Sequence, residues 1–272
     1  MSAPMNNQNA SPNQPSQEPN PENYHIGHRE RLKKRFLNEG LDHFEPHEVL
    51  ELVLFYVIPK QDTNMLAHRL LVRFGSLSGV LEADAEELMS VKGIGANAAV
   101  FLKLFPAVFR QYELSRLNAD GIFDTLEKVG NYAKSLFIGA TVERVYLLLF
   151  NNKLQLLETY FVADGSVNHA PILPRVVAER AIVKQAASIL LVHNHPHGNP
   201  LPTRDDIETT HTIDAACKLL GIHFLDHLIV TEQDFISILR SQKGLTRPSP
   251  LTGQSDTAFF QRYYGLEDKP ET

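Results

Sequence analysis

Two histidines and an aspartate have the types and the spacing of a catalytic zinc site. His193 and His195 follow an apolar run at residues 188–192, which is typical of a buried strand. Residues i and i+2 of an extended chain point to one face, so the two imidazoles are expected side by side. Thr203 has the character of a helix N-cap, which places Asp206 in the first turn of that helix. Two imidazoles and one carboxylate leave the fourth tetrahedral position for water, as in catalytic zinc sites.

Each half of this pattern also has a simpler interpretation. A His-x-His pair at the end of a strand is often only solvated or structural, and Thr203 and Asp206 would alone make a capping pair. Asp205 is an alternative acid. The combination of the two halves favours metal binding, and we expect one Zn²⁺ per chain, held by His193, His195 and Asp206.

Bulk properties narrow the class of protein. The formal net charge of −6 and the pI near 6.1 carry no general signature of nucleic-acid or membrane binding. No apolar run approaches the ~20 residues of a membrane span, and the N-terminus lacks the features of a signal peptide. Cys217 is the single cysteine, which suits a reducing compartment, and we expect it to be a core residue rather than a nucleophile. We therefore expect a soluble cytoplasmic protein.

Composition divides the chain into four regions. Residues 1–22 are mainly Asn, Pro, Gln and Ser, which bury too little apolar surface to offset the entropy of ordering, so we expect a disordered tail. Helical patterns fill residues 26–116, whereas strands mix with helices in residues 121–242. Residues 243–272 are a C-terminal tail, and their aromatic side chains at 259–264 indicate either a short packed helix or a docking segment. The expected fold is an all-helical domain followed by a mixed α/β domain.

Hydrophobic periodicity and turn residues predict the individual elements of both domains. Helices are expected at 46–57, 64–74 and 82–89 in the first domain, and at 124–137, 174–187 and from Thr203 onward in the second; strands are expected at 142–150, 154–162, 188–192 and 222–230. Asn151 and Asn152 are expected to form the turn of a hairpin.

With these residues in hand, the chain resembles the bacterial RadC family from about His28 to about Leu239. The resemblance is carried by His193-Asn-His195-Pro196 with Gly198, by Thr203-Arg-Asp-Asp206-Ile207, and by Leu225-Asp226-His227-Leu-Ile-Val230. It implies an N-terminal helix-hairpin-helix region and a C-terminal JAMM (MPN-type, cytidine-deaminase-like) domain. It also implies that His193, His195 and Asp206 bind zinc in a metallopeptidase-like hydrolase.

The same resemblance implies a glutamate beside the metal-bound water. Glu143 is the first candidate, and Glu158 and Glu179 are the alternatives. The chain departs from its relatives at Val176, where they often have glutamate, and at His197 and Thr203, where they usually have serine; the exposed-loop position of His197 favours a histidine that is not a ligand.

The chemistry implied is hydrolysis of a peptide or isopeptide amide in an unidentified protein or peptide substrate. Zinc lowers the pKa of bound water from about 15.7 towards 7. Glu143 would take the proton of that water and pass it to the leaving amine. Thr203 would donate a hydrogen bond to the oxyanion, a contribution on the order of 3 kcal/mol. Asp226 and His227 are either a second layer that orients a ligand or a satisfied polar pair.

A second function is indicated by Gly93-Ile-Gly95 in the helical domain. Glycines allow a phosphate to approach the backbone, and resemblance to helix-hairpin-helix modules implies sequence-independent DNA binding through Lys92, Gly93 and Gly95. Residues 26–116 hold twelve Lys and Arg against twelve Asp and Glu, which gives weak electrostatic support; the basic cluster is Arg29, Arg31, Lys33, Lys34 and Arg35. The rival interpretations are a DNA-repair accessory with a structural or inactive zinc site, a hairpin that only packs helices, and a catalytically idle scaffold.

Overall fold

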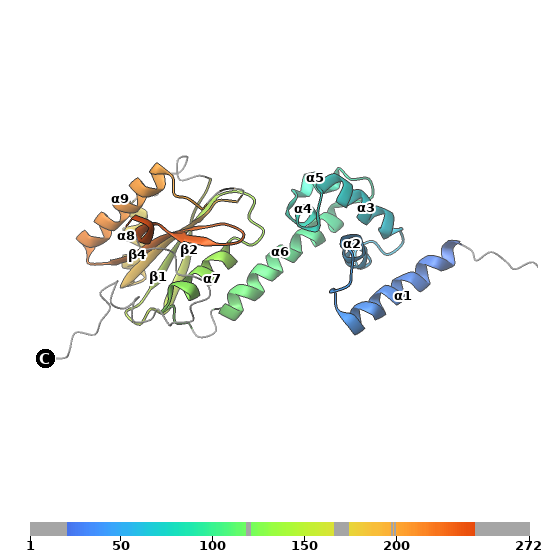
Figure 1. Ribbon diagram of the computed structural model, residues 1–272, viewed down its shortest axis with the longest axis horizontal. Coiled ribbons are helices and arrows are strands. Elements are labelled where there is room, and N and C mark those ends of the chain that lie inside the picture. The colour runs from blue at the N-terminus through green and yellow to red at the C-terminus, as the bar shows by residue number, and fades with distance from the viewer. Residues whose placement is uncertain (1–20, 118–120, 166–173, 197, 199, 243–272) are drawn as a thin grey trace, which may run out of the picture. The chain divides into compact units, whose positions relative to one another are not determined.

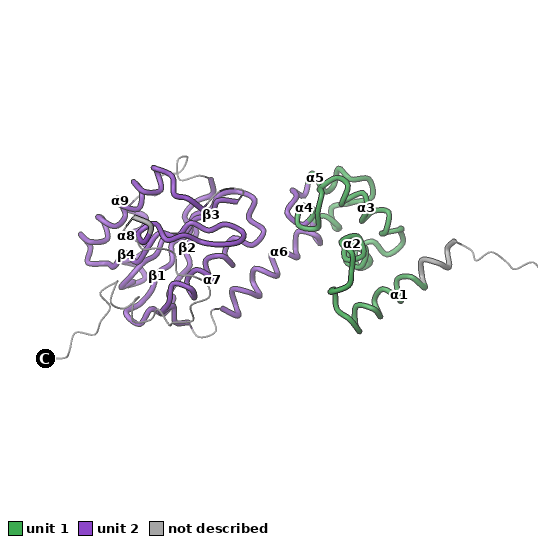
Figure 2. Tube along the Cα trace, viewed as in Figure 1, with its two compact units in different colours: residues 1–80, 86–99 green, residues 81–85, 100–272 purple. Residues whose placement is uncertain are grey.

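A computed structural model describes residues 21–117, 121–165, 174–196, 198 and 200–242 of the chain. It contains two compact units, residues 1–80 with 86–99 and residues 81–85 with 100–272 (Figure 2). The helix α6 (Ala96–Leu117) begins in the first unit and continues in the second. The domain boundary expected between residues 116 and 121 lies at the end of α6. The boundary between the two compact units lies earlier, between Ala99 and Val100, inside α6.

The first unit is helical, as predicted. It contains α1 (Pro21–Glu39), α2 (Pro46–Leu54) and α3 (Thr63–Phe74), and most of α4 (Leu77–Glu82) and α5 (Ala85–Met89). The helix expected at 82–89 corresponds to α5, which begins three residues later, whereas α4 was not predicted. Local signals set these ends, since a capping box between Glu45 and Glu48 opens α2 and Gly75, at φ 82°, closes α3. The predicted tail at 1–22 is too long by two residues, because α1 already includes Pro21; residues 1–20 lie outside the described residues.

The second unit is built on a five-stranded mixed sheet in the order β2-β1-β3-β4-β5. Its strands are β1 (Arg144–Phe150), β2 (Leu156–Asp164), β3 (Ser188–Asn194), β4 (His223–Val230) and β5 (Phe235–Ser237). Strand β1 is antiparallel to both β2 and β3, while β3, the central strand, is parallel to β4 and is joined to it by α9 (Arg204–Leu220). A parallel pair requires such a crossover, and this one starts from the histidine end of β3.

Helices cover both faces of the sheet (Figure 1). On one face, α7 (Leu126–Leu136) packs against alternate strand residues such as Leu148 and Val192. On the other face, α8 (Pro174–Val183) and α9 pack against the intervening residues, among them Leu147 and Leu191. His193 follows Leu191 by two positions, so its side chain belongs to the face of α8 and α9. The predicted mixed α/β domain is confirmed.

Several predicted boundaries were wrong by a few residues. The helix predicted at 174–187 ends at Val183, because Gln185 adopts a left-handed φ of 52° and the chain turns there into β3. The strand predicted from residue 154 begins at Leu156, since Leu154 also has a positive φ, 56°, and extends the hairpin turn. The C-terminal tail at 243–272, with its aromatic residues, lies outside the described residues.

Cys217 lies in the apolar core between the sheet and α9, as predicted. Burial and the nearby carboxylate of Asp214 raise the pKa of this thiol to about 12. A thiol that stays protonated at neutral pH is a poor nucleophile, so the chemistry of this unit lies elsewhere. Within the described part of the chain, no helix is both long and apolar enough to cross a bilayer.

Candidate metal centre

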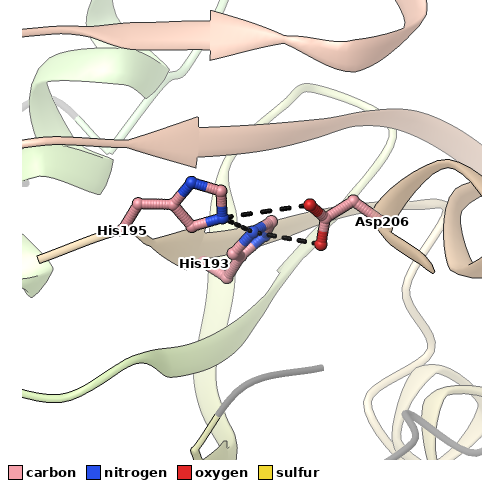
Figure 3. Close-up of side chains that lie close together, drawn as sticks. All are labelled: His193, His195 and Asp206. Carbon is pink, nitrogen blue, oxygen red and sulfur yellow. Dashed lines mark hydrogen bonds and ion pairs between the residues drawn. The ribbon is translucent and has the colours of Figure 1, made fainter. Parts of the chain in front are cut away.

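The three predicted metal ligands converge at the carboxyl end of β3 (Figure 3). His193 is the penultimate residue of β3, His195 comes directly after that strand, and Asp206 lies in the first turn of α9. Since α9 carries the chain from β3 to the parallel strand β4, its first turn lies close to the end of β3. The Nε2 atoms of His193 and His195 are 3.0 Å apart, and His193 Nε2 is 3.3 Å from Asp206 Oδ1.

These distances fit a small divalent cation. Ligand atoms about 2.0–2.1 Å from a tetrahedral zinc ion lie about 3.3 Å from one another. The two distances above lie near that spacing, and His195 Nε2 is 3.8 Å from Asp206 Oδ2. Among the described residues this is the one group of three or more His, Cys, Asp or Glu donors that meets in this way. The three residues together can therefore hold a metal ion.

Thr203 fixes the orientation of the aspartate. It is the N-cap of α9: its hydroxyl accepts from Asp206 N, while its own N–H and O–H groups donate to Asp206 Oδ2 at 2.8 and 2.7 Å. Oδ2 accepts both bonds and lies 3.8 Å from His195 Nε2, while Oδ1 lies 3.3 Å from His193 Nε2. Asp206 thus belongs to the helix cap and also serves as a candidate metal ligand. Asp205, the alternative acid, is exposed.

The two buried imidazoles of the site are neutral at neutral pH. Burial lowers the pKa of His193 to about 4, with a smaller contribution in the same direction from the nearby His195 and an opposing effect of the Asp206 carboxylate. Burial also holds the pKa of His227 well below its usual value, with smaller contributions from the other two histidines. A neutral imidazole keeps the lone pair that a metal needs, so a metal does not have to displace a proton from His193 at pH 7.

Glu143 lies in the same cavity as two of the predicted site residues. It directly precedes β1, and Val145, two residues later, pairs with His193 across the β1–β3 ladder. A cavity of about 500 Å³ is lined by Thr141, Val142, Glu143, His195, Pro196, Gly198, Leu201 and Thr203. A second cavity, of about 620 Å³, is lined by His195, Pro196, Gly198, Pro200, Thr231, Glu232, Gln233 and Asp234. His195 therefore lines both cavities, and Glu143 lines the first of them.

The alternative glutamates have other surroundings. Glu158 pairs with Leu149, towards the opposite end of β1, and its carboxylate forms ion pairs with Arg180 and Lys184. Glu179 is exposed on α8. Of the three candidates, Glu143 is the one that lines a cavity with His195.

Asn194, which the sequence did not single out, holds the segment that carries Glu143. Its Oδ1 accepts a hydrogen bond from Arg144 N at 2.7 Å, and its Nδ2 donates to Val142 O at 3.2 Å. The two bonds bracket Glu143 on both sides, and Asn194 is only 3% exposed. In an extended strand, a residue between His193 and His195 points to the opposite face from both histidines, so the position of Asn194 in the pattern was the available signal.

The residues of the third sequence signature divide between two roles. His227 Nε2 lies 2.8 Å from His193 Nδ1, so His227 is in direct contact with a predicted ligand. Asp226 accepts hydrogen bonds from Ser237 Oγ and from the backbone N–H groups of His227 and Leu239. His227 thus contacts the candidate ligand His193, while Asp226 ties β4 to Ser237 at the end of β5 and to Leu239 in α10 (Ile238–Gln242).

The predicted DNA-binding residues lie in the helical unit, in the loop between α5 and α6. Gly93 has a φ of 104°, which favours glycine, and a Cβ there would make a tight contact, 3.3 Å, with the Leu66 side chain. Lys92 and Gly95 are exposed. Within the basic cluster, Arg29 donates to three backbone carbonyls and Arg35 binds Glu48, so these guanidinium groups stabilise the helical unit itself.

Comparisons with known proteins agree with the resemblance seen in the sequence. Residues 123–245 match the RadC-like JAB domain, and residues 25–100 match the UPF0758 N-terminal family. A UPF0758 protein of Ruegeria pomeroyi is 36% identical over 203 residues, which cover 75% of this chain and 91% of that protein. The predicted helical region followed by an α/β domain of JAB/MPN type matches both findings. The chain therefore belongs to the RadC (UPF0758) family.

Proposed function

We propose that the second unit is a zinc-dependent hydrolase that cleaves a peptide or isopeptide amide in the cytoplasm. The observation that carries this proposal is the meeting of His193, His195 and Asp206 beside a cavity that Glu143 also lines. Two imidazoles, that of His193 fully buried and that of His195 partly buried, with a buried carboxylate are the donor set of a catalytic zinc site, which keeps one position open.

The residues of the cavity divide the chemistry among them. A bound zinc ion supplies Lewis acidity, which polarises a carbonyl and acidifies water. Glu143 would accept a proton in the cavity and deliver it to the leaving amine, as a general base and then a general acid. Thr203 would donate to the oxyanion, which requires its hydroxyl to turn from Asp206 Oδ2 towards the substrate.

The two cavities that share His195 in their lining suit an extended substrate. The first offers the apolar side chains of Val142 and Leu201 next to Glu143, and the second is bordered by residues 231–234. A chain that crosses His195 would occupy both hollows and place one amide beside Glu143. This arrangement favours a polypeptide over a compact small molecule.

Zinc content is the first test of this proposal. Purified wild-type protein should carry about one zinc per chain by elemental mass spectrometry, and His195→Ala should carry none, because a tetrahedral site needs its third protein ligand. Glu143→Gln should retain the metal and lose cleavage of a broad peptide library. The absence of zinc from wild-type protein, even after reconstitution, would overturn the proposal.

We also propose sequence-independent DNA binding by the helical unit as a second function. The supporting observation is a loop in which the positive φ at 93 favours glycine, followed by Gly95 with open space around it and then a long helix. Backbone N–H groups at such a helix start are able to bind a phosphate. The test by salt dependence is described in the Discussion.

A further inference from the structure

A chain of three hydrogen bonds runs from one proposed metal ligand to the backbone of another. His193 Nδ1 lies 2.8 Å from His227 Nε2, and His227 Nδ1 lies 2.7 Å from the hydroxyl of Thr210. That hydroxyl lies 2.6 Å from the carbonyl oxygen of Asp206. All four residues are buried, none more than 2% exposed, so these groups satisfy one another inside the protein.

The direction of every bond in this chain follows from its last member. The carbonyl of Asp206 can only accept, so Thr210 must donate its single hydroxyl proton there. The Thr210 oxygen is then an acceptor, and the proton between it and His227 belongs to His227 Nδ1. A neutral imidazole has one N–H group, so His227 Nε2 is an acceptor and the neighbouring proton belongs to His193 Nδ1.

The consequence is that His193 Nε2 carries no proton. This atom is the one that lies 3.0 Å from His195 Nε2 and 3.3 Å from Asp206 Oδ1, at the position where a metal would bind. We propose that Thr210 and His227 are positioning residues that hold both imidazoles in the Nδ1–H tautomer and so keep the lone pair of His193 Nε2 directed at the metal position before any metal binds. This inference rests on the proposed function, because it assigns the pair a role in metal binding.

The positions of these residues on α9, β3 and β4 explain why they lie next to one another. Thr210 lies one helical turn after Asp206 on α9, so one helix carries both the candidate ligand Asp206 and the hydroxyl that lies next to its carbonyl in the hydrogen-bond chain. His227 lies on β4, directly beside β3, which carries His193. The Nδ1–H form is the less common tautomer of free histidine in water, so these contacts select a form that the isolated residue does not prefer.

NMR of the imidazole nitrogens distinguishes the two tautomers in protein that contains no metal. In metal-free full-length protein labelled with ¹⁵N-histidine, long-range ¹H–¹⁵N correlations should show His193 and His227 with a proton on Nδ1. Thr210→Val removes the acceptor for His227 Nδ1–H and should shift His227, and with it His193, towards the Nε2–H form. An Nε2–H tautomer of His193 in the wild-type protein would overturn the inference.

Zinc affinity is the second readout, measured by competition with a chromophoric chelator. Thr210→Val should weaken zinc binding about 10–100-fold, the usual cost of losing an outer partner of a ligand histidine. Thr210→Ser keeps the hydroxyl and should restore the affinity. The matched control is Thr212→Val, because the Thr212 hydroxyl makes the same bond to a carbonyl, that of Glu208 at 2.8 Å, on the exposed side of α9.

The outcomes separate the two proposals. If Thr210→Val binds zinc as tightly as wild type, or if Thr210→Ser is as weak as Thr210→Val, packing rather than the hydroxyl decides and the inference is wrong. If wild-type protein binds no zinc at all, the proposed function fails, whereas the tautomers of the metal-free protein still decide whether the hydrogen bonds run as inferred.

Discussion

The metal centre and the loop at residues 93–95 are both features that the sequence marked for function, but their surroundings differ. At the metal centre, His193 and Asp206 are almost fully buried, and each is held by further polar groups. In the loop, Lys92 and Gly95 are exposed, and Gly93 is explained by its own backbone conformation. One site consists of buried side chains, the other of exposed backbone.

The difference shows where a structure is informative about chemistry. Burying polar groups costs free energy unless they bind one another or a ligand, so a buried polar cluster requires a reason. An exposed lysine and glycine pair costs almost nothing and needs no ligand to explain it. The metal centre therefore supports a stronger inference than the loop does, and each prediction below tests that contrast.

The largest effect is expected from Asp206→Asn. This change removes the charged ligand while keeping the size of the side chain, and zinc affinity should fall at least about 100-fold, because losing a ligand costs more than losing an outer partner. Asp205→Asn is the matched control, since Asp205 is the exposed neighbour on the same turn of α9. Equal losses in the two variants, by the chelator competition described above, would show that the buried carboxylate is not the ligand.

The three candidate ligands were accessible from sequence because their geometry is local. The i and i+2 spacing in a strand and the position of Asp206 after an N-cap are properties of short segments. The apolar runs at β1 and β3 likewise identified the central strands, since strands buried on both faces read as continuous hydrophobic stretches.

The groups that orient the ligands were less accessible because they come from other elements. Thr210 is one of several threonines on α9, and only the fold shows that it faces His227 on β4. Asn194 is visible as a polar residue between two histidines, but its partners, Arg144 N and Val142 O, lie about fifty residues earlier. Long-range pairing of this kind has no signal in a single sequence.

Buried neutral histidines make the stability of the metal-free protein depend on pH. The pKa of His193 is about 4 in the folded protein and about 6.5 when unfolded, so below pH 6.5 the unfolded chain binds a proton that the folded chain does not. The free energy of unfolding should therefore fall by about 3 kcal/mol as the pH drops from 6.5 to 4. His227 acts in the same direction, because burial also lowers its pKa.

Urea unfolding of metal-free protein at several pH values measures this dependence. His193→Gln should flatten the curve between pH 6.5 and 4, because it removes the titrating group. His43→Gln, at an exposed position, should leave the curve as it is in wild type. A dependence that survives in His193→Gln undiminished would mean that the burial of this imidazole does not control acid stability.

A smaller effect is expected from Asn194→Ala. Arg144 N and Val142 O would lose their side-chain partner, so the free energy of unfolding should fall by about 1–3 kcal/mol, while Asn152→Ala in the exposed turn should change it little. Zinc affinity should stay close to that of wild type, because strand pairing holds His193 and His195 independently. A loss of affinity as large as that of Asp206→Asn would show that Asn194 holds the histidines rather than the Glu143 segment.

The smallest effect is expected from Lys92→Ala, which tests the loop side of the contrast. If Lys92 contacts one phosphate, its loss should weaken DNA binding equally for all sequences and reduce the slope of log K against log salt by about 1. Lys153→Ala, in an exposed turn of the second unit, removes the same charge and should leave binding unchanged. Fluorescence anisotropy from 50 to 200 mM salt measures both variants. Equal losses would mean that only the net charge acts, and no binding by wild-type protein at low salt would leave the buried metal centre as the functional site and the glycines as parts of a helical hairpin.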